Sequence, residues 1–341
     1  MFKNLSKTIG KNQMKLSVIG VIAALGVGGW FLGGKEYWDY IMNSQAGGAA
    51  VGKTQIVDSN GNVITVDAPR DTSKMRDADI CREYIPWGTH EYADKAVKDR
   101  SLWMCKTSFS MQYDPIAKYP LWTAEIVSKK NLVKFNIPSS LTLRDDATIP
   151  LEMQPKVETF TKLPQGYKVG LVAPVLNRYL NMDSVTRDKL NDINFKSLTE
   201  SFYTTNAYPV ADQAKILIDN IDQKIRAFAE EKFEVFVISG LIFLNGQSLG
   251  VVENGDDKLL IPTHIYKIVT YPNTYASISY IIPNTNNLPC GNQCSPENFM
   301  VPMQEVERVT GIEFYTKLAP YYAVQVKKDL NQIFKDAIKE K

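Results

Sequence analysis

Apolar and polar positions recur along the chain in patterns that predict both strands and helices. Alternating or short apolar runs, typical of strands, occupy residues 107–113, 122–127, 169–174, 234–239, 261–271 and 274–282, the last two as a pair. Residues 54–66 alternate around Asn60-Gly61, a dipeptide typical of hairpin turns. These segments predict a sheet that is largely antiparallel.

Helical spacing is clearest over residues 210–231, where apolar side chains recur at steps of three and four. The apolar stripe consists of Ala214, Leu217, Ile221, Ile225 and Phe228. A shorter helix is predicted over 301–310, ended by Gly311, and an amphipathic helix over 321–338. Together with the strands, these helices predict an α+β fold in which helices pack on an antiparallel sheet.

A long uncharged segment near the start of the chain predicts a membrane anchor. Residues 16–34 hold 19 residues without a charge, and at ~1.5 Å per residue they span roughly 28 Å, close to the hydrocarbon thickness of a bilayer. Four lysines precede the segment, which predicts a cytoplasmic N-terminus and an exported main domain, periplasmic or extracellular. A cleaved signal peptide and a buried soluble helix are the alternatives.

The remaining chain divides by composition. We expect a cytoplasmic N-terminus at 1–15, the anchor at 16–34, a linker with the hairpin at 35–80, one globular domain at 81–318 and a C-terminal amphipathic helix at 319–341. All four cysteines follow the anchor. We expect Cys290 to pair with Cys294 and Cys81 with Cys105, as suits an oxidising compartment. A zinc site is the alternative, but neither pair has a neighbouring histidine.

The net charge and the number of histidines limit how the chain could bind nucleic acid and which residues could act as a general base. The chain carries 39 Lys and Arg against 37 Asp and Glu, a net charge of +2, so nucleic-acid binding requires a local patch rather than a global field. Only two histidines occur, His90 and His264. The choice of a general base that works near neutral pH is therefore narrow.

Six groups of residues, in order, resemble the DNA/RNA non-specific endonuclease family. They are FSMQYDP at 109–115 with PLW at 120–122, GY at 166–167, FYTTNAYP at 202–209, VFVISGLIF at 235–243, IPTHIYKI at 261–268 with SYIIPN at 279–284, and 301–311. The resemblance covers residues 81–318. It implies a ββα-metal fold and phosphodiester cleavage with one divalent metal.

The family's catalytic motif, Asp-Arg-Gly-His-x-Ala-Pro, corresponds to KVGLVAP at 168–174. The resemblance implies that the histidine accepts a proton from water and that the metal stabilises charge on the phosphate. Gly170, Ala173 and Pro174 match the motif. Lys168 stands for the aspartate, Val169 for the arginine and Leu171 for the histidine, so the general base is lost.

The resemblance also implies a helix that supplies a metal-binding asparagine and, two turns later, a glutamate. Aligned on Asn206 and Pro209, these positions hold Lys215 and Gln223. Aligned on Arg226, they hold Ala214 and Asp222. Neither alignment retains the metal-binding asparagine, so no cofactor is expected. Asp212, Asp219, Asn220 and Asp222 are oxygen donors that suit either a replacement metal site or a solvated helix face.

Other residues offer weaker candidates. His264 is expected to have a structural role, and His90 lies in a predicted loop as a remote candidate base. Lys168 and Lys215 are candidate phosphate contacts, or two solvent-facing lysines.

We therefore expect a membrane-anchored pseudo-nuclease that acts by binding, as part of an envelope or DNA-transfer assembly, with or without nucleic acid. One alternative is an active nuclease with relocated residues that uses magnesium or another divalent metal. Another is a structural component of a secretion or DNA-transfer machine that makes no contact with nucleic acid.

Overall fold

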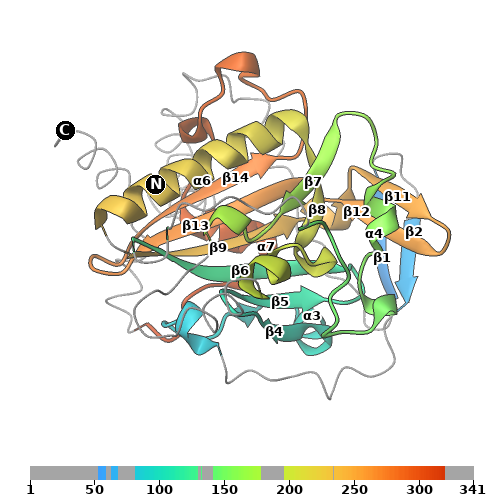
Figure 1. Cartoon of the computed structure of the whole chain (residues 1–341), viewed down its shortest axis with the longest axis horizontal. Coiled ribbons are helices and arrows are strands. Elements are labelled where there is room, and N and C mark those ends of the chain that lie inside the picture. Colours follow the sequence, from blue (N-terminus) through green and yellow to red (C-terminus); the bar gives the residue numbers. More distant parts are fainter. Residues whose placement is uncertain are drawn as a thin grey trace, which may run out of the picture.

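A central antiparallel sheet of seven strands organises the computed structural model (Figure 1). The structure describes residues 53–58, 63–67, 81–129, 132, 141–177, 196–232 and 234–318. In sheet order the strands are β15 (Met300–Val301), β14 (Ala276–Pro283), β13 (His264–Tyr271), β9 (Glu234–Ile242), β6 (Tyr119–Ser128), β5 (Ser110–Asp114) and β4 (Leu102–Cys105). The fold is mixed α and β, as the sequence predicts.

The central strands are covered on both faces. Every residue of β9 after Glu234 is buried, and its β-branched side chains suit a strand enclosed by two layers. The long helix α6 (Asp212–Lys232) lies across one face (Figure 1). The predicted apolar stripe of this helix is buried from Ala214 to Phe228. On the other face lie α7 (Met303–Thr310), β3 (Glu91–Tyr92) and β16 (Ile312–Glu313).

A second pair of strands leads into α6. β7 (Tyr167–Leu171) pairs antiparallel with β8 (Ala207–Ala211), and α6 follows β8 directly. The helix predicted to begin at residue 210 therefore begins at Asp212, because residues 210 and 211 still pair with β7. β7 ends at Leu171 rather than at the predicted Pro174, and just beyond it the backbone N–H of Val172 donates to the carbonyl of Asn206.

Proline shapes two other boundaries. The predicted strand 261–271 is divided, because β12 (Asp257–Ile261) ends before Pro262 and β13 begins at His264. Proline has no N–H to donate to a strand neighbour. α7 begins after Pro302 rather than at residue 301, and Gly311 closes it in the left-handed conformation, with φ +66°.

The remaining elements surround this frame. β1 (Lys53–Asp58) pairs antiparallel with β2 (Val63–Asp67), over the predicted hairpin segment, and in parallel with β10 (Gln247–Ser248). β11 (Gly250–Asn254) pairs with β12, a hairpin that the sequence did not predict. The short helices are α3 (Lys95–Arg100) and α4 (Val157–Phe160), with 3-10 helices at Arg82–Tyr84, Leu151–Met153, Val175–Asn177, Thr204–Asn206, Leu244–Gly246, Gly291–Gln293 and Pro296–Phe299.

Two disulfides form with the predicted pairing. Cys81 joins Cys105, which ties the start of the domain to β4, and Cys290 joins Cys294 within a short loop. Among the described residues no helix is both long and apolar enough to cross a membrane. The predicted anchor at 16–34 and the predicted helix at 321–338 lie outside the described residues.

Candidate functional site

A cleft of about 640 Å³ lies where the end of β7 and the turn after it face α6. It is lined by Thr142, Leu143, Val169, Gly170, Leu171, Pro174, Val175, Leu176, Phe202, Tyr208, Val210, Lys215, Ile218, Asp219, Asn220, Asp222, Gln223 and Arg226. The motif segment and the predicted metal helix thus meet in one place. The motif side of the cleft is mostly apolar, and the charged side chains come from α6.

The motif turn reaches the cleft with its apolar side chains. Val169, Leu171 and Pro174 line the cleft, while Val172 and Ala173 are buried behind it. Gly170 is required by close packing, because a Cβ there would lie 2.8 Å from ring carbons of Tyr208 and 3.0 Å from Val210. Close packing therefore fixes the backbone of the motif turn, and Leu171 is one of the side chains that it presents to the cleft.

The side chain of Asn206 holds this turn by hydrogen bonds to backbone atoms. Its amide oxygen accepts from the N–H of Ala173 at 2.9 Å, and its amide nitrogen donates to the carbonyls of Ala173 at 3.0 Å and Ser201 at 2.9 Å. The side chain of Asn206 is fully buried. A buried amide with its donors and acceptor satisfied in this way fixes the local geometry.

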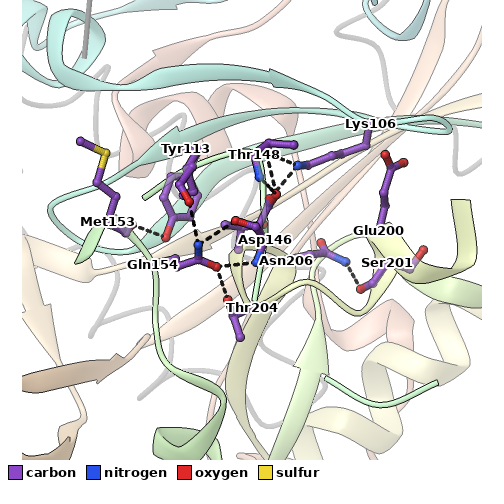
Figure 2. Close-up of polar contacts among 12 residues, drawn as sticks. Lys106, Tyr113, Asp146, Thr148, Met153, Gln154, Glu200, Ser201, Thr204 and Asn206 are labelled. Carbon is purple, nitrogen blue, oxygen red and sulfur yellow. Dashed lines mark hydrogen bonds and ion pairs between the residues drawn. The ribbon is translucent and has the colours of Figure 1, made fainter. Parts of the chain in front are cut away.

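A larger buried network lies behind Asn206 (Figure 2). Lys106 and Asp146 form an ion pair of 2.6 Å with side chains 1% and 0% exposed. Asp146 also accepts from the hydroxyls of Thr148 and Thr205, at 2.6 and 2.7 Å. Gln154 donates to the carbonyl of Asp146 and accepts from the hydroxyl of Thr204. The network thus anchors residues 204–206, which carry the clamp on the motif turn.

The charged groups of α6 near the cleft are largely paired. Lys215 forms an ion pair with Asp219 at 2.7 Å, one turn along the helix. Asp222 reaches under the helix to Lys267 of β13, at 2.8 Å, and both side chains are 5% exposed or less. Lys267 in turn donates to the hydroxyl of Ser239. Ala214 is fully buried and does not line the cleft.

The two candidate phosphate contacts are not brought together. Lys215 lines the cleft, but Lys168 does not, and its side chain is 66% exposed. The Lys168 ammonium pairs with Asp212 at the start of α6, at 3.0 Å. Each lysine already has a carboxylate partner, which lowers the positive potential that either offers to a phosphate.

A relay of polar side chains that the sequence did not reveal positions Arg226. Its guanidinium donates to the amide oxygen of Asn177 at 3.1 Å, and the Asn177 amide donates to Glu125 at 3.0 Å. Asn177 and Glu125 are 2% and 1% exposed. The one sequence signal is a charged residue inside an apolar strand, Glu125 in β6, and the same signal marks Lys267 in β13.

Both histidines lie on the face of the sheet opposite α6. Successive side chains of a strand point to opposite faces, so Tyr266 points away from α6 because Lys267 reaches Asp222 beneath it. Tyr266 contacts Phe314, and the His90 ring packs edge-on against Phe314 at 4.8 Å. His264 shares the face of Tyr266, two residues along β13. Neither histidine lines the cleft.

Burial keeps both imidazoles neutral. Desolvation lowers the pKa of His90 to about 3 and that of His264 to about 4. The structural role expected for His264 agrees with this environment, and the predicted loop around His90 is packed against the domain. Within the cleft, burial raises the pKa of the Tyr208 phenol, and the charges of Asp222 and Asp219 raise it further. Tyr208 is therefore a neutral group near pH 7.

The described residues of the cleft do not fit the divalent metal that the family resemblance implies. Magnesium prefers oxygen ligands in octahedral geometry, but the two aligned positions of the metal asparagine hold a buried alanine and an ion-paired lysine. The cleft carboxylates Asp219 and Asp222 are each paired with a lysine. Among the described residues, no group of three or more His, Cys, Asp or Glu side chains is placed to hold a metal.

The sequence comparisons with known proteins all find nucleases. A family model described as DNA/RNA non-specific endonuclease matches residues 182–320, a stretch that begins after the motif turn. The mitochondrial nuclease EXOG of Mus musculus is 21% identical over 225 residues, which cover 62% of this chain and 56% of the relative. The mitochondrial endonuclease G of Bos taurus is 22% identical over 219 residues, covering 61% of this chain and 67% of the relative.

The fold has a counterpart among solved structures. A chain in the crystal structure of the EndoG/EndoGI complex superposes with a TM-score of 0.55 at 18% identity, covering 73% of this chain and 96% of that chain. The chain described here spans 56% of the length of the mouse EXOG nuclease and 60% of that of the Danio rerio EXOG nuclease.

Proposed function

Because this chain belongs to the DNA/RNA non-specific endonuclease family, we propose that it is a member that binds rather than cleaves. The curated relatives are named as nucleases. The pairing of β7 and β8 ahead of α6 supports the ββα arrangement that the family resemblance implies. The cleft between these elements is then the counterpart of a nuclease site whose reactive groups are gone.

The observation that carries the proposal is the position of the imidazoles. The chain has only two histidines, and both are buried on the face of the sheet opposite the cleft, while Leu171 lines the cleft. An aliphatic side chain cannot accept a proton, and loss of a general base costs about 10²–10⁴-fold in rate. Tyr208 does not replace it, because burial and the charges of Asp222 and Asp219 raise the pKa of its phenol and keep it protonated near neutral pH.

Loss of metal binding is the second support. Removing a hard cation from phosphodiester chemistry removes the charge that stabilises the phosphate and the leaving oxygen. In this chain, Lys215 or Ala214 stands at the metal position, and Asp222 is held by Lys267. Both requirements of the family's reaction therefore fail in the same cleft.

We propose a membrane topology for the chain as well. Residues 16–34 anchor the chain in a membrane, with the short N-terminus in the cytoplasm and the cleft-bearing domain in the periplasm or outside the cell. The two disulfides suit that compartment. The domain then acts as a binding or scaffold component of an envelope or DNA-transfer assembly.

The test is a plasmid-degradation assay on the full chain with magnesium or manganese. We expect no cleavage above that of a buffer control. The Leu171→His/Lys215→Asn double variant, which restores both lost residue types, is run beside it, and we expect its cleavage to exceed that of the native chain. Robust cleavage by the native chain that EDTA abolishes would overturn the proposal.

The same assay decides the alternative of an active nuclease with relocated residues. Asp219, Asn220 and Asp222 line the cleft and supply oxygen atoms, which is the observation in its favour. That alternative requires Asp222→Ala to remove metal-dependent cleavage while the far-ultraviolet circular dichroism spectrum stays unchanged. The alternative without nucleic-acid contact is tested by salt-dependent binding of duplex DNA to the full chain.

A further inference from the structure

The rim of the cleft exposes apolar side chains that a folded domain normally buries. Three large apolar residues are strongly exposed in the described part of the chain: Leu151 at 57%, Leu176 at 48% and Ile216 at 56%. Leu176 lines the cleft, and Ile216 lies one helical turn before the cleft residue Asn220. Leu151 does not line the cleft. Two of the three therefore flank the same opening.

The floor between them continues the apolar surface. Leu171, Val175 and Ile218 line the cleft, and Val175 and Ile218 are at least nine-tenths buried. A volume of about 640 Å³ lies within the usual range of about 300–1,000 Å³ for ligand sites. This space accommodates several side chains of a bound segment.

Arg226 is the charged group of the cleft that has no counter-ion among the described residues. The charged lining residues are Lys215, Asp219, Asp222 and Arg226. Lys215 pairs with Asp219, and Asp222 pairs with Lys267. Within the described residues, Arg226 has an amide oxygen as its partner and no carboxylate. A guanidinium has five N–H donors and binds a carboxylate through two of them, so Arg226 retains capacity for one such group.

This charge pattern does not match a nucleic-acid strand. Binding a phosphate backbone depends on several cations that each neutralise one phosphate. The described lining of the cleft offers one guanidinium without a carboxylate partner, among apolar side chains. Asp219, 59% exposed at its side chain, adds a negative charge to the rim. The cleft is complementary to one negative charge with apolar neighbours.

We propose that the cleft binds a segment of a partner protein that presents one carboxylate between apolar side chains. The carboxylate pairs with Arg226, which the relay from Glu125 through Asn177 holds in place. The apolar side chains pack on Leu171 and Leu176 and against Ile216. This inference rests on the proposed function, because it assigns the ligand of a cleft that binds without cleaving.

The test uses a phage-displayed library of random dodecapeptides, selected on the purified full chain. We expect enrichment of sequences with one Asp or Glu flanked by apolar residues. For a selected peptide, we expect Arg226→Gln and Leu176→Ser each to weaken binding about tenfold or more, as measured by fluorescence anisotropy. Leu151→Ser is the matched control, an equally exposed leucine outside the cleft, and should leave binding unchanged.

A double-mutant cycle identifies the carboxylate contact. Replacing the acidic residue of the peptide by its amide should weaken binding to the native chain but add little in the Arg226→Gln variant. Enrichment of basic or purely polar peptides, equal loss in Leu151→Ser, or full additivity in the cycle would overturn the inference. So would displacement of the peptide by a single-stranded oligonucleotide at equal concentration.

The two proposals fail in different ways. Metal-dependent cleavage by the native chain contradicts the proposed function, whatever the peptide result. An inert chain that selects no acidic and apolar peptide contradicts the partner assignment alone. Folding of each variant is checked by its thermal unfolding midpoint, and Arg226→Lys, which keeps the charge, should recover part of the affinity that Arg226→Gln loses.

Discussion

The residues behind the motif turn differ from those in front of it in polarity and in role. Behind the turn, Lys106 and Asp146 belong to a buried polar network that reaches the hydroxyls of Thr204 and Thr205 (Figure 2). The neighbouring Asn206 bonds the backbone of Ala173 in the turn. In front of it, Val169 and Leu171 stand where the family resemblance places an arginine and a histidine. The residues that support the turn are therefore different from those that face the cleft.

The largest loss of stability is expected when the buried ion pair between Lys106 and Asp146 is removed. Lys106→Met leaves Asp146 buried without its cation, so the free energy of unfolding should fall by about 3–5 kcal/mol. Chemical denaturation of the full chain measures it. Lys98→Met is the control, because its pair with Glu91 is solvent-exposed, and should cost less than about 1 kcal/mol. Equal losses in the two variants would contradict the distinction.

Adding one methyl group to the turn should have the next effect. In Gly170→Ala the new Cβ meets the Tyr208 ring, and such overpacking costs about 1–3 kcal/mol. Gly250→Ala is the matched control, since its Cβ would have an ordinary 3.6 Å contact with Ile261. Thermal unfolding compares them. A Gly170→Ala variant as stable as Gly250→Ala would mean that the turn and the Tyr208 ring have room for the added methyl group.

The histidines should make stability depend on pH as structural residues do. The folded-state pKa of His90, about 3, lies below the unfolded value of about 6.5, so the unfolded chain binds the proton first. Stability is thus complete above pH 6.5 and falls towards pH 3, by up to about 1.4 kcal/mol per pH unit for this residue. His90→Phe should reduce that slope, as measured by urea unfolding between pH 4 and pH 7. An unchanged slope would contradict the assignment.

The smallest effect is expected in front of the turn. Leu171→Gln changes a partly buried side chain at the cleft surface, where no buried polar partner depends on it. The free energy of unfolding should change by less than about 1 kcal/mol. A loss as large as that of Lys106→Met would show that the leucine is part of the support, and the comparison of the two sides would then fail.

Local pattern was sufficient to predict some elements of the fold. The apolar stripe from Ala214 to Phe228 predicted α6, and Gly311 predicted the end of α7, because both signals lie within a few residues of the element. β8 was missed because Pro209 argues against a strand and because its partner, β7, lies far away in the sequence. The β11–β12 hairpin was missed as well.

In the candidate site, too, local sequence signals were predicted and long-range contacts were not. The motif alignment led to Gly170, Leu171 and Lys215, which line one cleft, and it included Lys168, which pairs with Asp212 outside the cleft. Lys267, Glu125 and Asn177 were not predicted, because their roles depend on contacts across the sheet. A polar residue in a buried strand signals such a contact but does not identify its partner.

The bonds from Asn206 to Ala173 have a consequence for which substitutions the turn accepts. They recognise the peptide groups of residue 173, which every amino acid except proline supplies in full, and so they place no requirement on the side chain at position 171. The Leu171 side chain itself is constrained by its packing against the hydrophobic core. The scaffold around the turn can therefore stay the same while the side chain that faces the cleft changes.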